Sequence, residues 1–172
     1  FGVAGLVYFG RQSDVWQLAR AEHSTATGEI RQMTLPDGTQ LVLASASAVD
    51  VEYSGTERRI VLRVGEVMVT TAADTHTPAR PLSLLTEHGS IRALGTRFSV
   101  QQLAQATDVQ VFEGAVQIKP VDAPLTLVRI DAGEGARFDR LAVQTPYQAA
   151  SSAESWTQGM LVAEGMRLDA FV

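Results

Sequence analysis

The feature that most constrains this chain is an alternation of apolar and polar residues with a period of two, which runs from Glu29 almost to Val143. In residues 48–54, for example, the apolar side chains would lie on one face of a strand and the acidic ones on the other. Turn residues interrupt the alternation about every 8–12 residues, as they do in all-β sandwiches and barrels. The sequence therefore predicts an all-β fold, an antiparallel two-sheet sandwich or roll.

Three of the expected turns would join neighbouring strands into hairpins, at Pro36-Asp37-Gly38, at Glu113-Gly114 and within residues 131–135. Gly65 interrupts another apolar run and predicts a bulge or a corner there. The segments expected to form strands are, in chain order, 29–35, 41–43, 48–54, 59–69, 82–87, 90–94, 97–103, 108–112, 115–119, 125–130 and 136–138.

The phrase Leu94-Gly95-Thr96 stands between two of these strands. Gly95 permits a backbone conformation that a side chain would forbid, and the Thr96 hydroxyl follows close to the Gly95 carbonyl. We expect a corner here, with the preceding strands forming one wall of the β body and the following strands forming the facing wall.

The two ends of the chain differ from this β region. Residues 1–10 carry no charge and are too short to cross a bilayer, which takes about 20 apolar residues. We interpret them as the end of a transmembrane helix, with a buried first strand as the alternative. Residues 11–28 would form a short juxtamembrane helix and a linker, capped at Ser13-Asp14.

After the β region, expected at 29–144, the small polar residues 145–155 predict a second linker. Residues 156–172 would begin a small C-terminal subdomain, with a strand at 156–163 followed by a turn and the start of a helix. We take this subdomain to be truncated, since it is too short to fold alone.

Composition limits the function classes. A net charge of −5 is a poor match to nucleic acid, and the absence of cysteine excludes disulfides and thiolate metal sites. His23, His76 and His88 do not share the spacing of metal ligands, so neither a metal nor a cofactor is predicted. Arg58 and Arg59 are expected at a solvated strand edge.

Several phrases together resemble the FecR family of transmembrane anti-sigma regulators. The resemblance is dense over residues 27–138. It rests on Leu35-Pro36-Asp37-Gly38-Thr39, Arg59-Ile60-Val61-Leu62 with Gly65-Glu66-Val67, Arg80-Pro81-Leu82, Ile91 to Val100 with Leu94-Gly95-Thr96-Arg97-Phe98, Val109 to Val116, and Asp131-Ala132-Gly133-Glu134. Leu82 departs from the family pattern, which usually has an aromatic residue there.

This resemblance implies a single-pass inner-membrane protein whose periplasmic region is the present chain. A cytoplasmic part outside this sequence would hold an extracytoplasmic-function sigma factor. The periplasmic part would receive a signal from the signalling domain of a TonB-dependent outer-membrane receptor, in the control of iron and siderophore uptake. The tail is similar to the family's link into a small subdomain like the secretin/TonB short N-terminal fold.

The family pattern also implies a chemical step, because some members cleave themselves between the glycine and the threonine that correspond to Gly95 and Thr96. A threonine hydroxyl can attack the preceding carbonyl if the peptide is held under strain and a base lies nearby. Glu66, His88 and Glu113 are the candidate bases by chemistry alone. The structural alternative is a strand corner whose hydroxyl bonds to the backbone.

Two further interpretations remain open. Trp156, Met160, Leu161 and Val162 could bind a partner by strand addition, or Trp156 could be a core residue of the C-terminal subdomain. A different class of function is a secreted carbohydrate-binding or carbohydrate-processing domain, for which the chain offers only two Trp and three Tyr.

Overall fold

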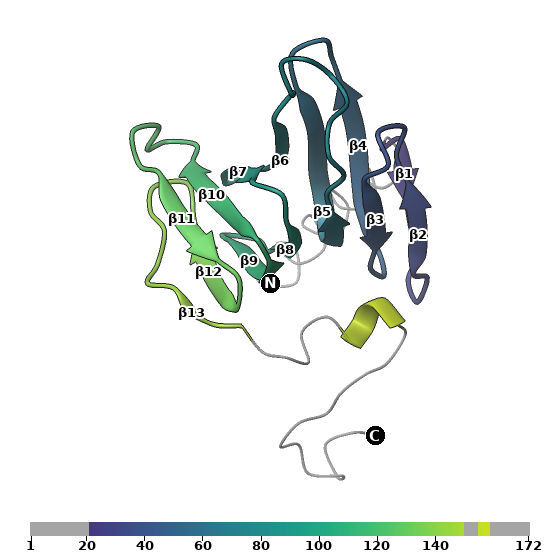
Figure 1. Cartoon of the computed structure of the whole chain (residues 1–172). Coiled ribbons are helices and arrows are strands. Elements are labelled where there is room, and N and C mark those ends of the chain that lie inside the picture. The colour runs from purple at the N-terminus through teal and green to yellow at the C-terminus, as the bar shows by residue number, and fades with distance from the viewer. Residues whose placement is uncertain (1–20, 150–154, 159–172) are drawn as a thin grey trace, which may run out of the picture.

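The strand β5 (Arg58–Thr70) organises the computed structural model, which describes residues 21–149 and 155–158 (Figure 1). Its first part pairs with β4 (Ala48–Tyr53) and β6 (Leu82–Thr86). Its second part pairs with β3 (Gln40–Leu43) and β8 (Arg97–Gln102). Because β5 belongs to both halves, the described strands form one curled sheet around a common interior.

The all-β prediction is confirmed. The remaining described elements are β1 (His23–Ser24), β2 (Arg31–Thr34), β7 (Gly89–Ala93), β9 (Thr107–Glu113), β10 (Ala115–Pro120), β11 (Val128–Asp131), β12 (Glu134–Phe138), β13 (Tyr147–Gln148) and a short 3-10 helix, η1 (Ser155–Gln158).

Gly65 is the point where β5 passes from one half to the other. Its φ is +85°, and a Cβ at this position would lie 2.2 Å from Ser47 Oγ. The register of β4 against β5 also shifts beside it, between Ala48 and Val49. The corner predicted at Gly65 is therefore present, and a residue with a side chain would be both strained and obstructed there.

The two halves are interleaved along the chain. The first half contains β1, β4, the start of β5, β6, β7, β10 and β11; the second contains β2, β3, the end of β5, β8, β9, β12 and β13. The expectation that the strands before Gly95 form one wall and those after it the other was wrong, because the chain crosses between the halves repeatedly.

The strand pairing confirms one expected hairpin and corrects three other expectations. The hairpin at Pro36-Asp37-Gly38 forms between β2 and β3. The hairpin expected at Glu113-Gly114 does not, since β9 pairs with β8 and β12 while β10 pairs with β7 and β11. For the same reason β11 and β12 form no hairpin, and the parallel pair of β5 with β6 makes the sheet mixed.

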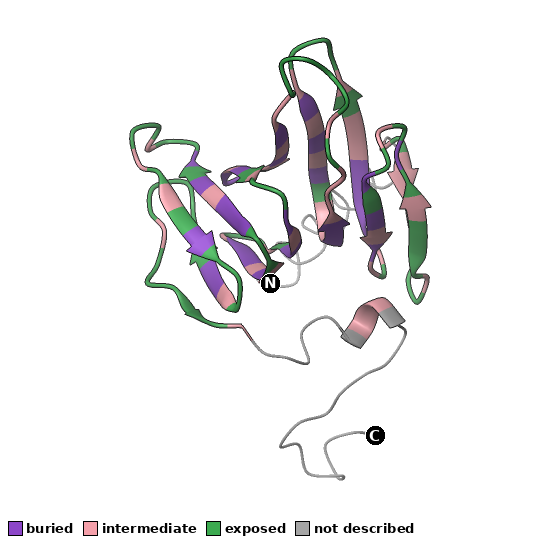
Figure 2. Cartoon of the chain, in the orientation of Figure 1, coloured by how far each residue is buried: buried purple, intermediate pink, exposed green. Residues whose placement is uncertain are grey.

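One hydrophobic core holds both halves together. Phe98 and Phe138 are the largest fully buried side chains. Buried residues occur on strands of both halves (Figure 2), and their apolar side chains form one cluster. The core cluster contains Leu35, Leu41, Leu43, Val49, Ile60, Leu62, Val67, Val69, Leu82, Leu84, Ile91, Phe98, Val100, Val109, Val111, Val116, Ile118, Ile130, Ala136 and Phe138. Leu82 is among them, so this position packs well without an aromatic ring.

The boundaries of the β body are wider than expected. His23–Ser24 forms β1, inside the segment expected as a linker, and Tyr147–Gln148 forms β13, inside the second expected linker. Ser155–Gln158 is a 3-10 helix, where a strand was expected from Trp156 onward. The expected helices within residues 1–20, and Met160, Leu161 and Val162, lie outside the described residues. Within the described ranges no helix is long and apolar enough to span a membrane.

Candidate functional site

The corner that follows β7 stacks against three other corners of the sheet, and we call this set the corner ladder: Thr71, Gly95-Thr96, Gly114 and Ala132. The Thr71 N–H donates to the Thr96 carbonyl at 3.0 Å, and the Thr96 N–H donates to Thr71 Oγ1 at 2.8 Å. On the other side, the Ala132 N–H donates to the Gly114 carbonyl at 3.0 Å. The Thr96 side of the Gly95–Thr96 peptide is thus fixed by Thr71, and Gly114 is fixed in turn by Ala132.

Gly95 and Gly114 adopt the same unusual backbone conformation, each with φ of +73°. A Cβ on Gly114 would lie 2.1 Å from the Gly95 carbonyl oxygen, whereas a Cβ on Gly95 would meet nothing within 4 Å. Gly114 therefore gives the Gly95 carbonyl the space it occupies. Gly95 is required only by its backbone angle.

The Thr96 hydroxyl has no structural role in hydrogen bonding. The residue is 4% exposed, and its Oγ1 is buried with no hydrogen-bond partner among the described residues. Leaving a buried polar group unsatisfied costs about 1–3 kcal/mol. The expected alternative, a hydroxyl bonded to the backbone, is therefore not what the described residues provide. A buried, unpaired hydroxyl in a native structure requires an explanation of its own.

Of the three candidate bases, only Glu113 lies at the corner ladder. Glu113 opposes Arg97 in the β8–β9 register, and Arg97 Nε donates to its carboxylate at 3.1 Å. Glu66 lies on β5 four residues before Thr70, which is about 13 Å along a strand. His88 precedes β7, so the length of that strand, about 20 Å with its flanking residues, separates it from Gly95.

Each of the three histidines has polar neighbours of its own. His88 is buried, and its Nδ1 lies 3.0 Å from Thr107 Oγ1. His23 and His76 each lie beside one carboxylate, those of Glu22 and Asp74. Among the described residues no group of three or more His, Asp or Glu side chains is arranged to hold a metal ion.

A buried ion pair forms a site that the sequence did not reveal. Arg58 Nη1 lies 2.7 Å from Asp37 Oδ2, and the two side chains are 7% and 5% exposed. Asp37 also accepts bonds from the hydroxyls of Thr39 and Tyr53, and Arg58 donates to the Ala72 carbonyl. The expectation of a solvated edge was thus wrong for Arg58. The partner that buries it lies 21 residues away and gives no signal in the local pattern.

This ion pair ties the turn between β2 and β3 to the start of β5. A second pair continues it, because Arg80 Nη2 lies 2.9 Å from Asp74 Oδ1 and Arg58 Nε donates to the Arg80 carbonyl. One polar network with a structural role therefore contains residues of two family motifs, Pro36-Asp37-Gly38 and Arg80-Pro81.

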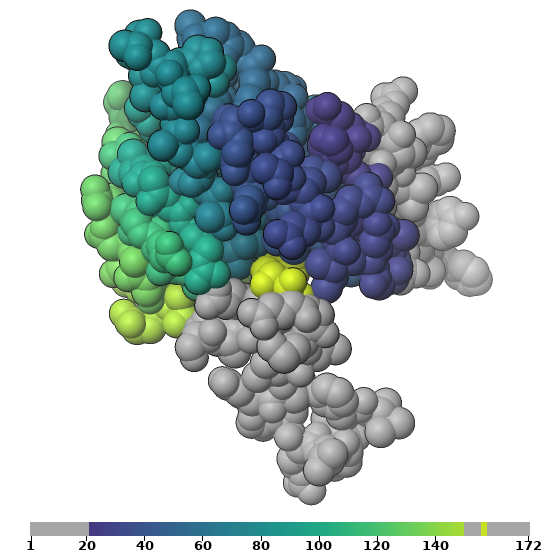
Figure 3. All heavy atoms as spheres, turned by 45° about the vertical axis from the view of Figure 1, so that its right-hand side comes forward, coloured from purple at the N-terminus to yellow at the C-terminus, as the bar shows by residue number. Residues whose placement is uncertain are grey.

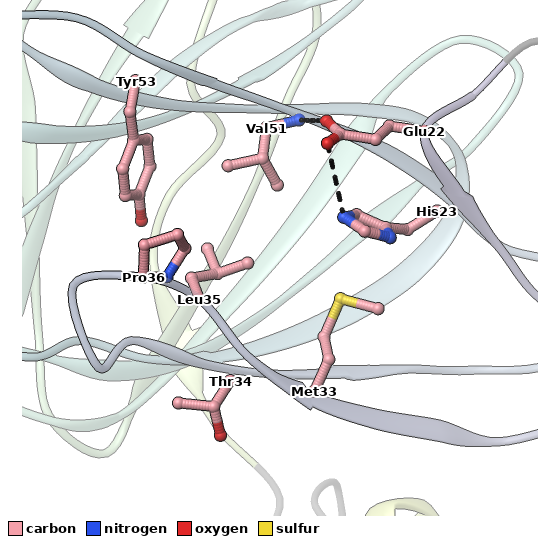
Figure 4. A pocket seen from close by; sticks show the side chains of 8 residues that line it. All are labelled: Glu22, His23, Met33, Thr34, Leu35, Pro36, Val51 and Tyr53. Carbon is pink, nitrogen blue, oxygen red and sulfur yellow. Dashed lines mark hydrogen bonds and ion pairs between the residues drawn. The ribbon is translucent and has the colours of Figure 1, made fainter.

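A pocket of about 480 Å³ opens beside this network, between β1, β2 and β4 (Figure 4). Met33, Leu35 and Val51 give it an apolar floor, while Glu22 and His23 stand at one side. Tyr53 is its one aromatic side chain, and that hydroxyl already donates to Asp37. A single engaged ring is not the stacking platform that a carbohydrate site uses, so the pocket does not favour the carbohydrate alternative.

The curled sheet with its interleaved halves places the chain in a known class of β fold. It is similar to two crystal structures of a candidate anti-sigma factor from Parabacteroides distasonis. The first has a TM-score of 0.67 and 24% sequence identity, and the match covers 80% of this chain and 64% of that one. The second has a TM-score of 0.65 and 22% sequence identity, and the match covers 87% of this chain and 70% of that one. The chain thus spans just under two thirds of the first of these proteins, and the likeness concerns the fold.

The family is shown by the sequence itself. The profile of the FecR protein family matches residues 21–117, which is more than half of the chain. The chain belongs to the FecR family, and the matched range includes Gly95, Thr96 and Gly114. No curated protein matches the chain.

Proposed function

We propose that this chain is the signal-receiving region of an anti-sigma regulator. The observation that carries the proposal is the FecR match over residues 21–117, supported by a fold shared with candidate anti-sigma factors. The pocket at β1, β2 and β4 holds no cluster of three acidic or histidine side chains, and a binding or signalling role needs none. We therefore assign a regulatory role to the chain.

The finer part of the proposal concerns place and partners. The region would lie in the periplasm, attached to the inner membrane through a helix that ends within residues 1–10. A cytoplasmic part would hold an extracytoplasmic-function sigma factor, and the signalling domain of a TonB-dependent receptor would supply the signal. Control of iron or siderophore uptake is the corresponding physiological role.

The test is genetic. Deleting the gene for the whole protein should change the transcript of a neighbouring TonB-dependent receptor severalfold, in either direction, when the cells are grown with and without iron. A plasmid copy of the whole gene should restore the original level. If neither the deletion nor the restored gene changes the level of the receptor transcript, the proposed role is contradicted.

We also propose that the Gly95–Thr96 peptide cleaves itself. Thr96 Oγ would attack the Gly95 carbonyl carbon and pass its proton to a base, for which Glu113 is the nearest of the candidates. The Gly95–Thr96 C–N bond breaks, the nitrogen takes up a proton, and an ester joins the two residues. Water then hydrolyses the ester to a Gly95 carboxylate and a Thr96 with free amine and hydroxyl.

Mass spectrometry of freshly purified protein tests this step. We expect two fragments, one ending at Gly95 and one starting at Thr96. Thr96→Val, which keeps the shape but removes the hydroxyl, should give only the intact chain, and Thr96→Ser should still cleave. An intact wild-type chain, or equal cleavage in the Thr96→Val protein, would refute self-cleavage and leave the corner as a structural element.

A further inference from the structure

Part of the outer face of the second half is covered although it faces away from the core, whereas Gln101 and Arg137 on the same face are exposed. On β5 the apolar residues Val67 and Val69 belong to the core cluster, so Glu66 and Met68 point outward. Met68 is nevertheless only 3% exposed, as is Ser99, its partner on β8. The outer face of a sheet is open to water unless something lies on it, so this burial requires a cover.

One part of the cover is Tyr147. It pairs with Gly135 at the edge of the second half, and a Cβ on Gly135 would lie 2.6 Å from the tyrosine ring. Glycine at this position lets the ring lie across β12. The Tyr147 hydroxyl then donates to Asp108 Oδ2 on β9 at 2.7 Å.

A second part of the cover is η1, which lies directly against the β body (Figure 3). The Trp156 indole N–H is buried and makes no regular hydrogen bond among the described residues. It lies near enough to the Glu66 carboxylate to favour the ionised form of that group. The Tyr147 phenol thus donates to one carboxylate of this face, and the buried indole of Trp156 lies near the other.

The two carboxylates belong to one cross-strand row. Glu66 opposes Gln101 on β8, Gln101 opposes Asp108 on β9, and Asp108 opposes Arg137 on β12. The row therefore runs across the second half, from the strand under Trp156 to the strand under Tyr147.

We propose that this outer face, defined by Glu66, Met68, Ser99 and Asp108, is the docking surface of the chain's own C-terminal segment. Tyr147 is the anchor at Asp108 and Trp156 is the anchor at Glu66. The surface would attach whatever follows the β body to strands β5 and β9. The proposal is independent of the signalling role and of cleavage, because it concerns only contacts within the chain.

Docking at Glu66 is linked to protonation. Burial raises the pKa of Glu66 to about 7; Trp156 opposes this rise, and the Asp108 carboxylate adds to it. The other groups facing the row are Gln101, which is neutral, and Arg137, whose Nε lies 3.4 Å from Asp108. If the segment lifts off, Glu66 meets water and its pKa returns toward the ordinary 4.5.

The sign follows from these two states. The pKa is higher when the segment is docked, so docking takes up a proton and is favoured below pH 7. As the pH rises through 7, the buried carboxylate ionises and docking weakens. Between pH 8 and pH 6 the ratio of docked to free segment should rise about tenfold.

Acrylamide quenching of Trp156 measures this ratio. Trp16→Phe leaves Trp156 as the only indole in the chain. We expect Trp156 to be more shielded at pH 6 than at pH 8, because the docked form binds the proton more tightly. Glu66→Gln, a neutral match to the protonated form, should shield Trp156 equally at both pH values. Tyr147→Phe should increase accessibility at both pH values while keeping the change in the docked-to-free ratio between them.

Met68→Lys provides an independent check, since a charge beneath the segment should expose Trp156 at every pH while the β body stays folded by circular dichroism. A Trp156 as accessible as a free indole at pH 6 would overturn the docking surface. Shielding that does not change between pH 6 and pH 8 in the protein with Glu66 intact would overturn Glu66 as an anchor, and with it the proposal.

Discussion

At the scale of single residues, the Asp37–Arg58 pair shows how burial decides what a charge contributes. Removing one member of a buried pair leaves the other uncompensated, so Arg58→Met should lower the free energy of unfolding by about 3–5 kcal/mol. Arg59 is the matched control: it is adjacent, it pairs with Glu52 and Glu57, and it is partly exposed. Arg59→Met should cost less than about 1 kcal/mol. Urea unfolding measures both, and equal costs would contradict the structural role of Arg58.

The same pair predicts how stability depends on acid. Burial alone would raise the pKa of Asp37, but hydrogen bonds from Arg58, Thr39 and Tyr53 together hold it below its ordinary value of 3.8. A carboxyl with a lowered pKa stabilises the fold fully above the unfolded value and loses that contribution as the pH falls through the folded value. Urea unfolding should therefore show stability falling below about pH 4. In Asp37→Asn the loss of stability at low pH should be smaller. If the loss is as large as in the wild-type protein, other carboxyl groups cause it.

At the scale of elements, Gly95 and Gly114 allow strain and obstruction to be separated. Both have φ of +73°, but only Gly114 has the Gly95 carbonyl in the place of a Cβ. Gly95→Ala should lower the free energy of unfolding by about 1–2 kcal/mol, because alanine is strained in the left-handed conformation. Gly114→Ala should cost that much plus about 1–3 kcal/mol for the clash. Thermal or urea unfolding of the two variants gives the difference; equal costs would mean that the corner ladder is looser than described.

The sequence predicted where the strands lie better than how they pair. Alternation is local, so residues 48–54 and 97–103 could be assigned to strands from their own side chains. Glu113-Gly114 looked like a hairpin because a tight hairpin and a crossing corner use the same residues, with glycine at positive φ. Which of the two forms depends on which distant strands share the core, and that information is not in the turn.

Engineered disulfides test the pairing directly, because the chain has no cysteine of its own. Gln117 opposes Arg92 in the pairing of β10 with β7. A hairpin centred on Glu113-Gly114 would instead place Gln117 opposite Gln110. The variant with Arg92→Cys and Gln117→Cys should lose its free thiols on mild oxidation, while the variant with Gln110→Cys and Gln117→Cys should keep them. Thiol titration of the folded proteins reads the result, and the opposite outcome would restore the hairpin.

At the scale of the whole molecule, the interleaving of the halves determines what cleavage could release. Strand β7 before the scissile peptide pairs with β10 after it, and β8 after it pairs with β5 before it. The fragments on either side of Gly95–Thr96 would therefore remain in one body. We expect cleaved protein to give two bands on a denaturing gel and one peak, at the volume of the uncleaved Thr96→Val protein, on size exclusion. Fragments that separate without denaturant would contradict the described topology.

The candidate site was predicted only in part. Gly95 and Thr96 could be found from the sequence because the family phrase marks them. That Gly114 packs on their peptide, that Glu66 and His88 lie far from it, and that Arg58 is buried depend on the crossings between halves. The partner role of Trp156 stays a prediction, and its indole N–H is buried.

The central claim is that this FecR-family chain receives its signal by binding another protein. The most direct measurement is titration calorimetry of this chain with the purified signalling domain of the proposed partner, a TonB-dependent receptor. We predict saturable one-to-one binding, and no binding to the signalling domain of an unrelated receptor. No heat of binding across the concentration range of the titration, or equal binding to both domains, would contradict the account.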